Sequence, residues 1–201
     1  MARTWRQQAP VIVLVSGFAL FVATLASLVA SSLAGREVRT FVPTPPPAGA
    51  ATRPLAGEVP YAIDTVTLDA SDSRTWRRVD LVQGGAVASD SAPWDLAVRR
   101  HHMVARGGAI DLGVVALERV TSVPRTGYLP TSWGADTVTP ALRRWYRYRI
   151  LTHLLEPNGH VYAVRTHDGR FALLEPLGYY CPGPRAGCLT FRVRYPVASS
   201  P

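Results

Sequence analysis

Five histidines are the main candidates for a chemical role in this sequence, because neutral imidazole is a common ligand for transition metals and for haem iron. They are His101, His102, His153, His160 and His167. In an extended strand over residues 94–105, His101 and Met103 share one face and His102 points to the other. The pair His101/Met103 is therefore a candidate ligand pair. No separate metal centre is predicted.

Local signatures of catalysis are missing from the sequence. It contains no G-x-S-x-G elbow, no P-loop, no H-E-x-x-H motif and no glycine-rich dinucleotide turn. Serine, histidine and aspartate occur without a pattern that would join them. We therefore predict that the protein is not an enzyme and has no cofactor, haem being the one possible exception.

The only two cysteines are Cys181 and Cys188, in the loop CPGPRAGC. Proline and glycine favour a tight turn there, which would bring the two thiols together. A disulfide between them persists only in an oxidising compartment. Two reduced, buried thiols are the alternative.

An apolar run near the N-terminus, residues 11–34, contains 24 residues without a charge. As a helix it would be about 36 Å long, enough to cross a hydrocarbon core of about 30 Å. A signal peptide is the alternative, but the run exceeds the usual apolar core of about 7–15 residues. We predict a retained transmembrane anchor after a cytoplasmic stretch, residues 1–10. With a disulfide, the domain would lie in the periplasm, attached to a bacterial inner membrane.

Small residues recur every fourth position along this run, which favours close packing against another transmembrane helix. They are Ala19, Ala23, Ser27, Ser31 and Gly35. The predicted partners are therefore the lipid bilayer and other membrane-protein subunits.

Beyond the anchor, a proline-rich linker over residues 35–60 gives way to period-two alternation. Strands are predicted over 62–69, 75–82, 94–105, 111–120, 145–155, 160–166, 170–179 and 189–195. Asn158-Gly159 suggests a hairpin between the fifth and sixth of these. The predicted fold is mostly β: a single antiparallel domain, residues 61–201, preceded by one transmembrane helix.

All 22 basic residues are arginines, against 14 acidic residues, and the formal net charge is +8. The predicted β domain carries 17 arginines and 12 acidic residues, an excess of +5. A domain outside the inner membrane does not meet nucleic acid. Arginines that alternate with apolar residues would form a solvated face or a docking surface. These are Arg147, Arg149, Arg192 and Arg194.

Several motifs resemble the HmuY-like family. W-D-L-A-V-R-R at residues 94–100 is similar to a signature of that family, as is the glycine-rich step at 106–109. Further matches are Trp145-Tyr146, Thr152-His153-Leu154, residues 162–166, Asp168-Gly169, Tyr179-Tyr180 and residues 189–191. The resemblance covers residues 69–197. It implies an outward-facing β protein, and it implies possible haem binding through paired axial side chains. His153 matches a histidine of the family's short members and is a third candidate ligand.

Two functions follow from these features. The first is a non-catalytic accessory subunit of a bacterial membrane complex, such as a photosynthetic reaction centre with its antenna or a respiratory assembly. The alternative is a membrane-tethered haem-binding protein.

Overall fold

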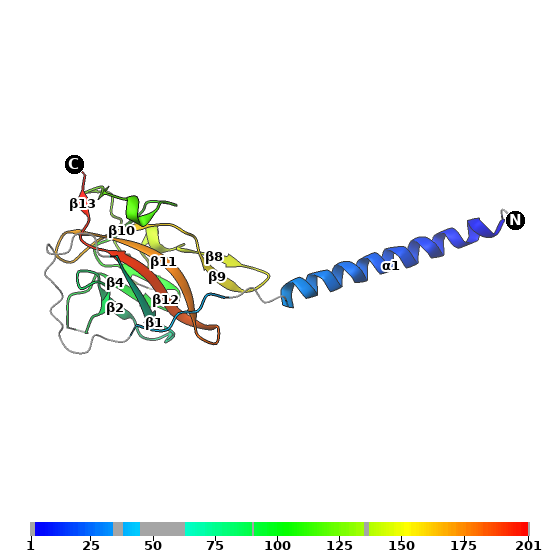
Figure 1. Ribbon diagram of the computed structural model, residues 1–201, viewed down its shortest axis with the longest axis horizontal. Helices are drawn as coiled ribbons and strands as arrows, with labels where there is room; N and C mark the ends of the chain where they lie inside the picture. Colours follow the sequence, from blue (N-terminus) through cyan, green and yellow to red (C-terminus); the bar gives the residue numbers. More distant parts are fainter. Residues whose placement is uncertain (1–2, 34–37, 45–62, 90, 135–136, 201) are drawn as a thin grey trace. The chain divides into compact units, whose positions relative to one another are not determined.

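The computed structural model describes residues 3–33, 38–44, 63–89, 91–134 and 137–200 (Figure 1). Residues 1–38 with the turn 150–152, and residues 39–149 with 153–201, form two compact units. The N-terminal helix and the β domain are each described by themselves.

Helix α1 covers Arg3–Leu33. Within it, Val13–Ser31 is apolar and long enough to cross a membrane, with a mean hydropathy of 2.3 and no buried part. The hydroxyls of Thr24 and Ser31 donate to the carbonyls of Leu20 and Leu28, so these polar groups are satisfied inside the helix. The predicted apolar helix is confirmed. Its length and composition suit an anchor and a signal sequence alike. Gly35 lies outside the described residues.

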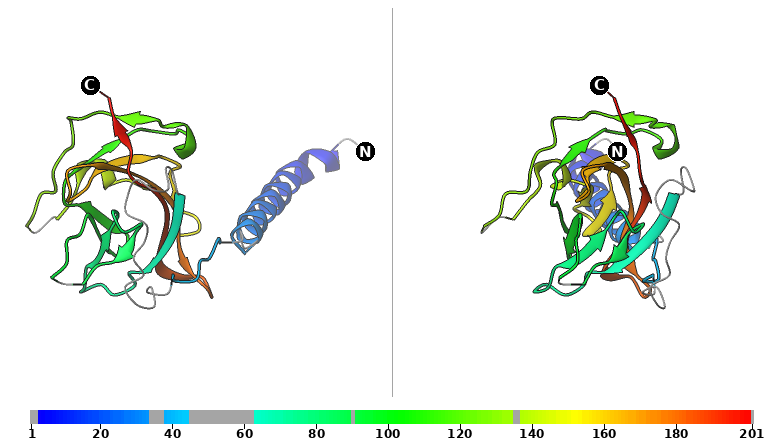
Figure 2. Two further views of the ribbon diagram at one scale, coloured as in Figure 1. Left: turned by 60° about the vertical axis from the view of Figure 1, so that its left-hand side comes forward. Right: turned by 90° about the vertical axis from the view of Figure 1, so that its left-hand side faces the viewer.

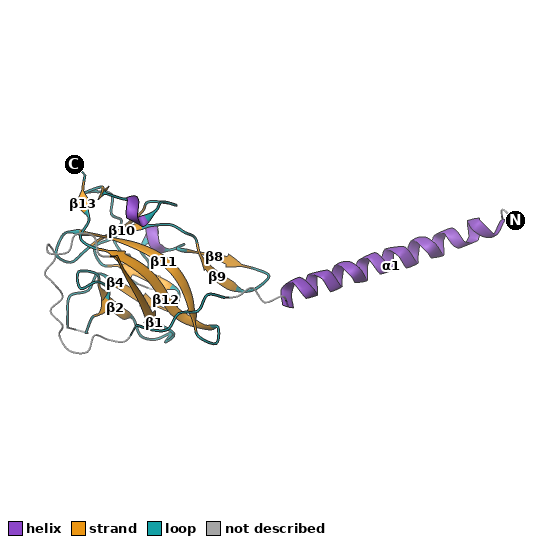
Figure 3. Ribbon diagram, in the orientation of Figure 1, coloured by secondary structure: helices purple, strands orange, loops and turns teal. Residues whose placement is uncertain are grey.

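The rest of the described chain is almost entirely strands and turns, as predicted (Figure 3). The strands are β1 Ile63–Asp69, β2 Arg77–Asp80, β3 Ala86–Val87, β4 Leu96–Arg99, β5 His102–Ala105, β6 Ala109–Asp111, β7 Ser122–Val123, β8 Tyr146–Arg149, β9 Leu154–Pro157, β10 Tyr162–Arg165, β11 Phe171–Cys181, β12 Arg185–Arg194 and β13 Ala198–Ser199. Two short 3-10 helices cover Leu117–Arg119 and Pro140–Leu142.

A five-stranded antiparallel sheet in the order β1-β12-β11-β10-β6 forms the centre of the domain. Strand β11 is buried on both faces, because its side chains alternate between two cores. Phe171 and Leu173 belong to a cluster with Leu117, Val123 and Val197. The intervening Ala172 and Leu174 are also fully buried and point the other way. Residues 112–128, which we call the covering segment, pack on this cluster through Leu117 and Val123. Figure 2 shows this segment and the C-terminal strand β13 on one side of the sheet.

The second sheet has the order β3-β2-β4-β5 and is tied to the first by one buried carboxylate. Asp95, fully buried, accepts hydrogen bonds from the backbone N–H of Leu81 and from the backbone N–H of His167. The backbone N–H of Arg100 donates to the carbonyl of Ala70, which adds a second link. The aspartate of the W-D-L-A-V-R-R motif, Asp95, therefore connects the two sheets.

The prediction of a hairpin at Asn158-Gly159 is wrong. Instead, β8 and β9 pair with each other, with Tyr148 opposite Leu155, and β10 pairs with β6 and β11. The Asn158 side-chain amide donates to the Arg144 carbonyl and to the Tyr162 hydroxyl. Asn158 therefore holds the connection from β9 to β10, which lie in different sheets. Strands β8 and β9 form a separate two-stranded arm (Figure 1).

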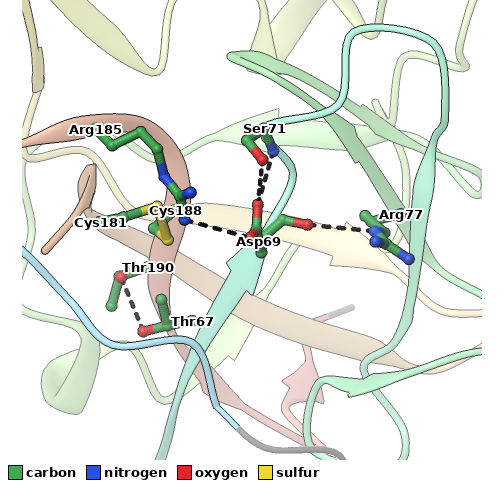
Figure 4. Close-up of a disulfide and its surroundings, with 8 residues drawn as sticks. All are labelled: Thr67, Asp69, Ser71, Arg77, Cys181, Arg185, Cys188 and Thr190. Carbon is green, nitrogen blue, oxygen red and sulfur yellow. Dashed lines mark hydrogen bonds and ion pairs between the residues drawn. A yellow bond between two sulfur atoms is a disulfide. The ribbon is translucent and has the colours of Figure 1, made fainter.

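The Cys181–Cys188 disulfide is confirmed, with a sulfur–sulfur distance of 2.09 Å at the end of the β11–β12 hairpin. Asp69, at the end of β1, lies opposite Cys188 and accepts hydrogen bonds from the backbone N–H and the hydroxyl of Ser71 (Figure 4). The cross-link therefore closes the end of the three longest strands.

Two of the four predicted docking arginines are not on a free surface. Arg192 is bound between Glu118 and Glu175, and Arg194 is only 4% exposed and donates to the backbone carbonyl of Glu118. The covering segment lies over this face of β12, so the alternating arginines hold it in place. Arg147 and Arg149 are exposed, on the β8–β9 arm.

Part of the proline-rich segment is fixed to the β domain. Thr40 forms a parallel bridge with Tyr180, and the backbone N–H of Phe41 donates to the Tyr180 carbonyl. The Phe41 ring lies over Gly178, where a Cβ atom would come within 2.3 Å of it. Thr44 and Thr67 exchange hydrogen bonds. We call residues 40–44 the entry strap. Residues 45–60 lie outside the described residues.

Candidate functional site: a cleft lined by histidines and arginines

One cleft, with a volume of about 640 Å³, gathers histidines, arginines and apolar side chains from three parts of the domain. Its size is in the range of small-molecule and cofactor sites. The lining residues are Arg99, His101, His102, Met103, Ser132, Thr137, Val138, Leu142, Arg143, Arg144 and Tyr146.

The two neighbouring histidines lie together in this cleft, with ring centroids 4.2 Å apart and a tilt of 33°. Opposite orientations were expected from strand alternation. The expectation is wrong because Arg100 and His101 form the two-residue turn between β4 and β5, where Arg99 pairs with His102. Arg100 has a φ of 52°, so the chain leaves the extended conformation just before His101.

Both imidazoles have a pKa below the ordinary value, which favours their neutral form. Burial lowers the pKa of His101, and the charges of His102 and Arg100 lower it further. Burial, followed by Arg99, lowers the pKa of His102. A neutral imidazole offers a nitrogen lone pair to a metal, whereas a protonated ring has none to give.

Aromatic side chains fix the position of His101. Its ring meets Tyr146 and Tyr179 edge to face, at centroid distances of 5.5 and 6.5 Å. The indole N–H of the fully buried Trp145 donates to the His101 carbonyl at 2.8 Å. Trp145 therefore connects the start of the β8–β9 arm to the histidine turn.

The opposite wall of the cleft is pinned to β5 by two buried threonines. The hydroxyl of Thr131 donates to the Ala105 carbonyl, and the Ala105 backbone N–H donates to the hydroxyl of Thr139. The two hydroxyls also bond each other at 2.7 Å. Residues 131–134 and 137–142, which supply Ser132, Val138 and Leu142 to the cleft, are therefore fixed against β5.

Arginines give the cleft a positive charge. Arg99 stacks over the Trp76 ring at 4.6 Å, which limits its motion, while Arg143 and Arg144 are exposed at the rim. Guanidinium groups bind carboxylates through paired hydrogen bonds. The cleft therefore suits a ligand that is partly apolar, carries carboxylates and accepts a nitrogen ligand.

The structure brings together two of the three predicted haem-ligand candidates. His101 and Met103 both line the cleft, although Met103 is only 3% exposed. His153 lies outside the lining, beside the turn between β8 and β9, where its Nδ1 bonds the Tyr148 hydroxyl. His102 was predicted to point away from His101, and Tyr146 and the three arginines were not predicted as site residues. The run Arg99-Arg100-His101-His102 was the available signal, and the turn within it was not recognised.

A second cluster, Asp80, Asp95 and His167, has its ligand-type atoms within 4.8 Å of one another. Both oxygens of Asp95 already accept N–H groups, from Leu81 on one side and His167 on the other. Burial, with the nearby Asp95 charge adding to it, raises the pKa of Asp80 against the effect of its own hydrogen bonds. These contacts describe a structural link between the two sheets.

No protein-family model matches the sequence, and neither does any curated protein. Solved structures do match. A lipoprotein candidate from Bacteroides fragilis has a TM-score of 0.55 at 22% identity, over 69% of this chain and 91% of that one. An HmuY-like haem-binding candidate from Bacteroides vulgatus has a TM-score of 0.55 at 20% identity, over 67% and 92%. An HmuY analogue from Tannerella forsythia, in its apo form, has a TM-score of 0.56 at 16% identity, over 68% and 96%. The chain thus has the HmuY-like fold that its motifs implied.

Proposed function

We propose that the β domain binds haem in the cleft between β5, the segment 131–144 and the start of β8. The observation that carries this proposal is the adjacent pair of neutral imidazoles, His101 and His102, in a cleft of cofactor size. The similar protein from Bacteroides vulgatus is an HmuY-like haem-binding candidate, which supports the same function.

Each type of lining residue has a role towards such a ligand. His101 or His102 would supply a nitrogen to the iron, since imidazole is a common protein ligand of haem. The apolar side chains of Val138 and Leu142 would pack against the macrocycle, and Tyr146 would offer an aromatic face. Arg99, Arg143 and Arg144 would pair with the carboxylates of the haem side chains.

The two histidine rings lie 4.2 Å apart between centroids, so they would offer nitrogens from one place in the cleft. The thioether of Met103 lines the same cleft and would be a further candidate ligand.

We prefer haem binding to the other predicted function, that of an accessory subunit of a photosynthetic or respiratory complex. The cleft and the fold favour a binding protein, and they offer no feature specific to such a complex. Helix α1 favours a membrane-attached protein, and the disulfide favours an oxidising compartment such as the periplasm. Partner subunits in the membrane stay a prediction from the small-residue stripe.

Titration of haemin into the full-length protein in mild detergent tests the proposal. We expect a shifted Soret band that saturates at one haem per chain. The double substitution His101→Ala/His102→Ala should weaken binding at least about tenfold, a loss of about 1.4 kcal/mol.

His153→Ala is the matched control, because that histidine lies outside the cleft. Arg143→Gln/Arg144→Gln should weaken binding and leave the position of the Soret band unchanged, since these residues act on carboxylates. A wild-type spectrum identical to haemin in detergent, or equal binding by the double histidine variant, would show that the proposal is wrong.

A further inference from the structure

The tip of the β8–β9 arm exposes two adjacent large apolar side chains. Ile150 is 76% exposed and Leu151 is 82% exposed. Turns between strands normally carry glycine, asparagine, aspartate or proline, which suit both the backbone and water. An isoleucine-leucine pair in such a turn leaves apolar area in water without a structural need.

The arm behind this tip carries aromatic and cationic groups. Tyr148 is exposed, and Arg147 and Arg149 alternate with the tyrosines along β8. Residues 143–157 hold four arginines and one acidic residue, Glu156, which pairs with Arg149. An apolar tip with alternating tyrosines and arginines behind it combines the groups that are enriched at a membrane–water interface.

The arm also lies beside the point where the chain from α1 enters the domain. Tyr180 forms the bridge to Thr40 of the entry strap, and its hydroxyl accepts a hydrogen bond from the backbone N–H of Leu155 in β9. One residue therefore contacts both the entry strap and strand β9 of the arm.

The connection to the candidate membrane span is short. Eight residues, 32–39, separate Ser31 at the end of that span from Thr40. Fully extended, they reach at most about 29 Å. When α1 lies in a bilayer, the domain cannot move farther from its surface than this tether allows.

We propose that the turn Ile150–Leu151 inserts into the interface of the bilayer that holds α1, and that Arg147 and Arg149 contact anionic lipid headgroups. The occupant is a lipid surface with net negative charge, because the arm is rich in arginine and its tip is apolar. The contact would give the β domain a second attachment besides its tether. This surface is separate from the histidine cleft.

A fluorescent label at the tip tests the proposal in the full-length protein. The substitution Leu151→Cys allows labelling with the environment-sensitive dye NBD, since both native cysteines are in the disulfide. The protein is reconstituted in phosphatidylcholine bilayers with phosphatidylglycerol, in the presence or absence of lipids with a nitroxide on the acyl chain. We expect a blue shift of the emission and quenching by the nitroxide.

Val114→Cys is the matched control, because Val114 is 75% exposed and lies on the covering segment. Its label should keep the emission seen in water. Arg147→Gln should reduce quenching at the tip in phosphatidylglycerol bilayers and change nothing in pure phosphatidylcholine.

Water-like, unquenched emission at residue 151 in both bilayers would overturn the proposal. A blue shift without quenching would place the tip against protein and would overturn it too. Ile150→Ser/Leu151→Ser should leave the affinity for haemin unchanged, so this proposal and haem binding fail separately.

Discussion

At the scale of single residues, the site depends on where protons lie. His101 and His102 are kept neutral by burial and by neighbouring positive charge. Asp168, at the turn before β11, also has a lowered pKa, but for a carboxyl group this favours the charged form. Burial acts to raise its pKa, but hydrogen bonds from Thr166, Tyr195 and Arg170 outweigh it and lower the pKa to about 2.

Haem binding should therefore tolerate mild acid. Because the pKa of both cleft histidines lies below the ordinary value of 6.5, their protonation competes with iron only at lower pH. We expect the affinity for haemin to stay constant down to pH 6.5 and to fall below it. Haemin titrations across this range measure the midpoint. A midpoint above 6.5 would contradict the neutral pair.

Asp168 should contribute to acid stability. Its pKa in the folded state lies below the unfolded value of 3.8, so its contribution is complete above pH 3.8 and is lost as pH falls through about 2. Asp168→Asn should lower the free energy of unfolding at pH 7 by about 1 kcal/mol, a modest value because the group is partly exposed. It should also flatten the acid limb of stability. Urea unfolding at several pH values measures both effects, with Glu156→Gln on the exposed arm as control.

At the scale of elements, hydrogen bonds of two buried residues connect the segments around the cleft. The buried Asp95 joins the sheet of β4 to the turn before β11, and Trp145 joins the β8–β9 arm to the histidine turn. Both of these hydrogen bonds join residues that are far apart in the sequence. The disulfide is different, because it closes a single hairpin.

Removal of the disulfide should destabilise the β domain without abolishing its fold. The bridge closes a loop of eight residues, 181–188, for which loss of chain entropy predicts about 2 kcal/mol. Cys181→Ser/Cys188→Ser should reduce the free energy of unfolding by this amount in urea denaturation. Reducing agent should lower the stability of the wild type to the same value and leave the variant unchanged. An equal effect of reductant on both proteins would contradict the assignment.

At the scale of the whole molecule, the entry strap is the described part of the connection to α1 that is fixed on the β domain. The strap is held by Tyr180 and Thr67, and Gly178 provides the space for Phe41. A proline-rich sequence predicts a spacer, but these contacts fix its first residues on the sheet.

Gly178→Val should displace the strap, because the new side chain would overlap the Phe41 ring. We expect faster tryptic cleavage after Arg39, detected by mass spectrometry as a fragment that begins at Thr40. The free energy of unfolding should fall by about 1–3 kcal/mol. Phe41→Ala/Gly178→Val removes the overlap and should recover part of that stability. Unchanged cleavage in Gly178→Val would show that the strap is not held by this contact.

Sequence alone determined the features that depend on near neighbours or on composition. The apolar helix followed from an uncharged run, the β fold from period-two alternation, and the disulfide from two cysteines around a tight turn. The motifs at Trp94–Arg100 and Tyr162–Thr166 implied the HmuY-like fold, which the solved structures match.

Tertiary structure alone decided the site and its surroundings. A two-residue turn set His101 beside His102, and Ser132 together with residues 137–144 closed the cleft from elsewhere in the chain. The same alternating pattern placed Arg147 in water and Arg194 beneath the covering segment. Alternation tells which residues share a face, whereas distant segments decide what covers that face. For this reason the candidate ligands were only partly predictable, and the arginines could not be assigned before the fold was known.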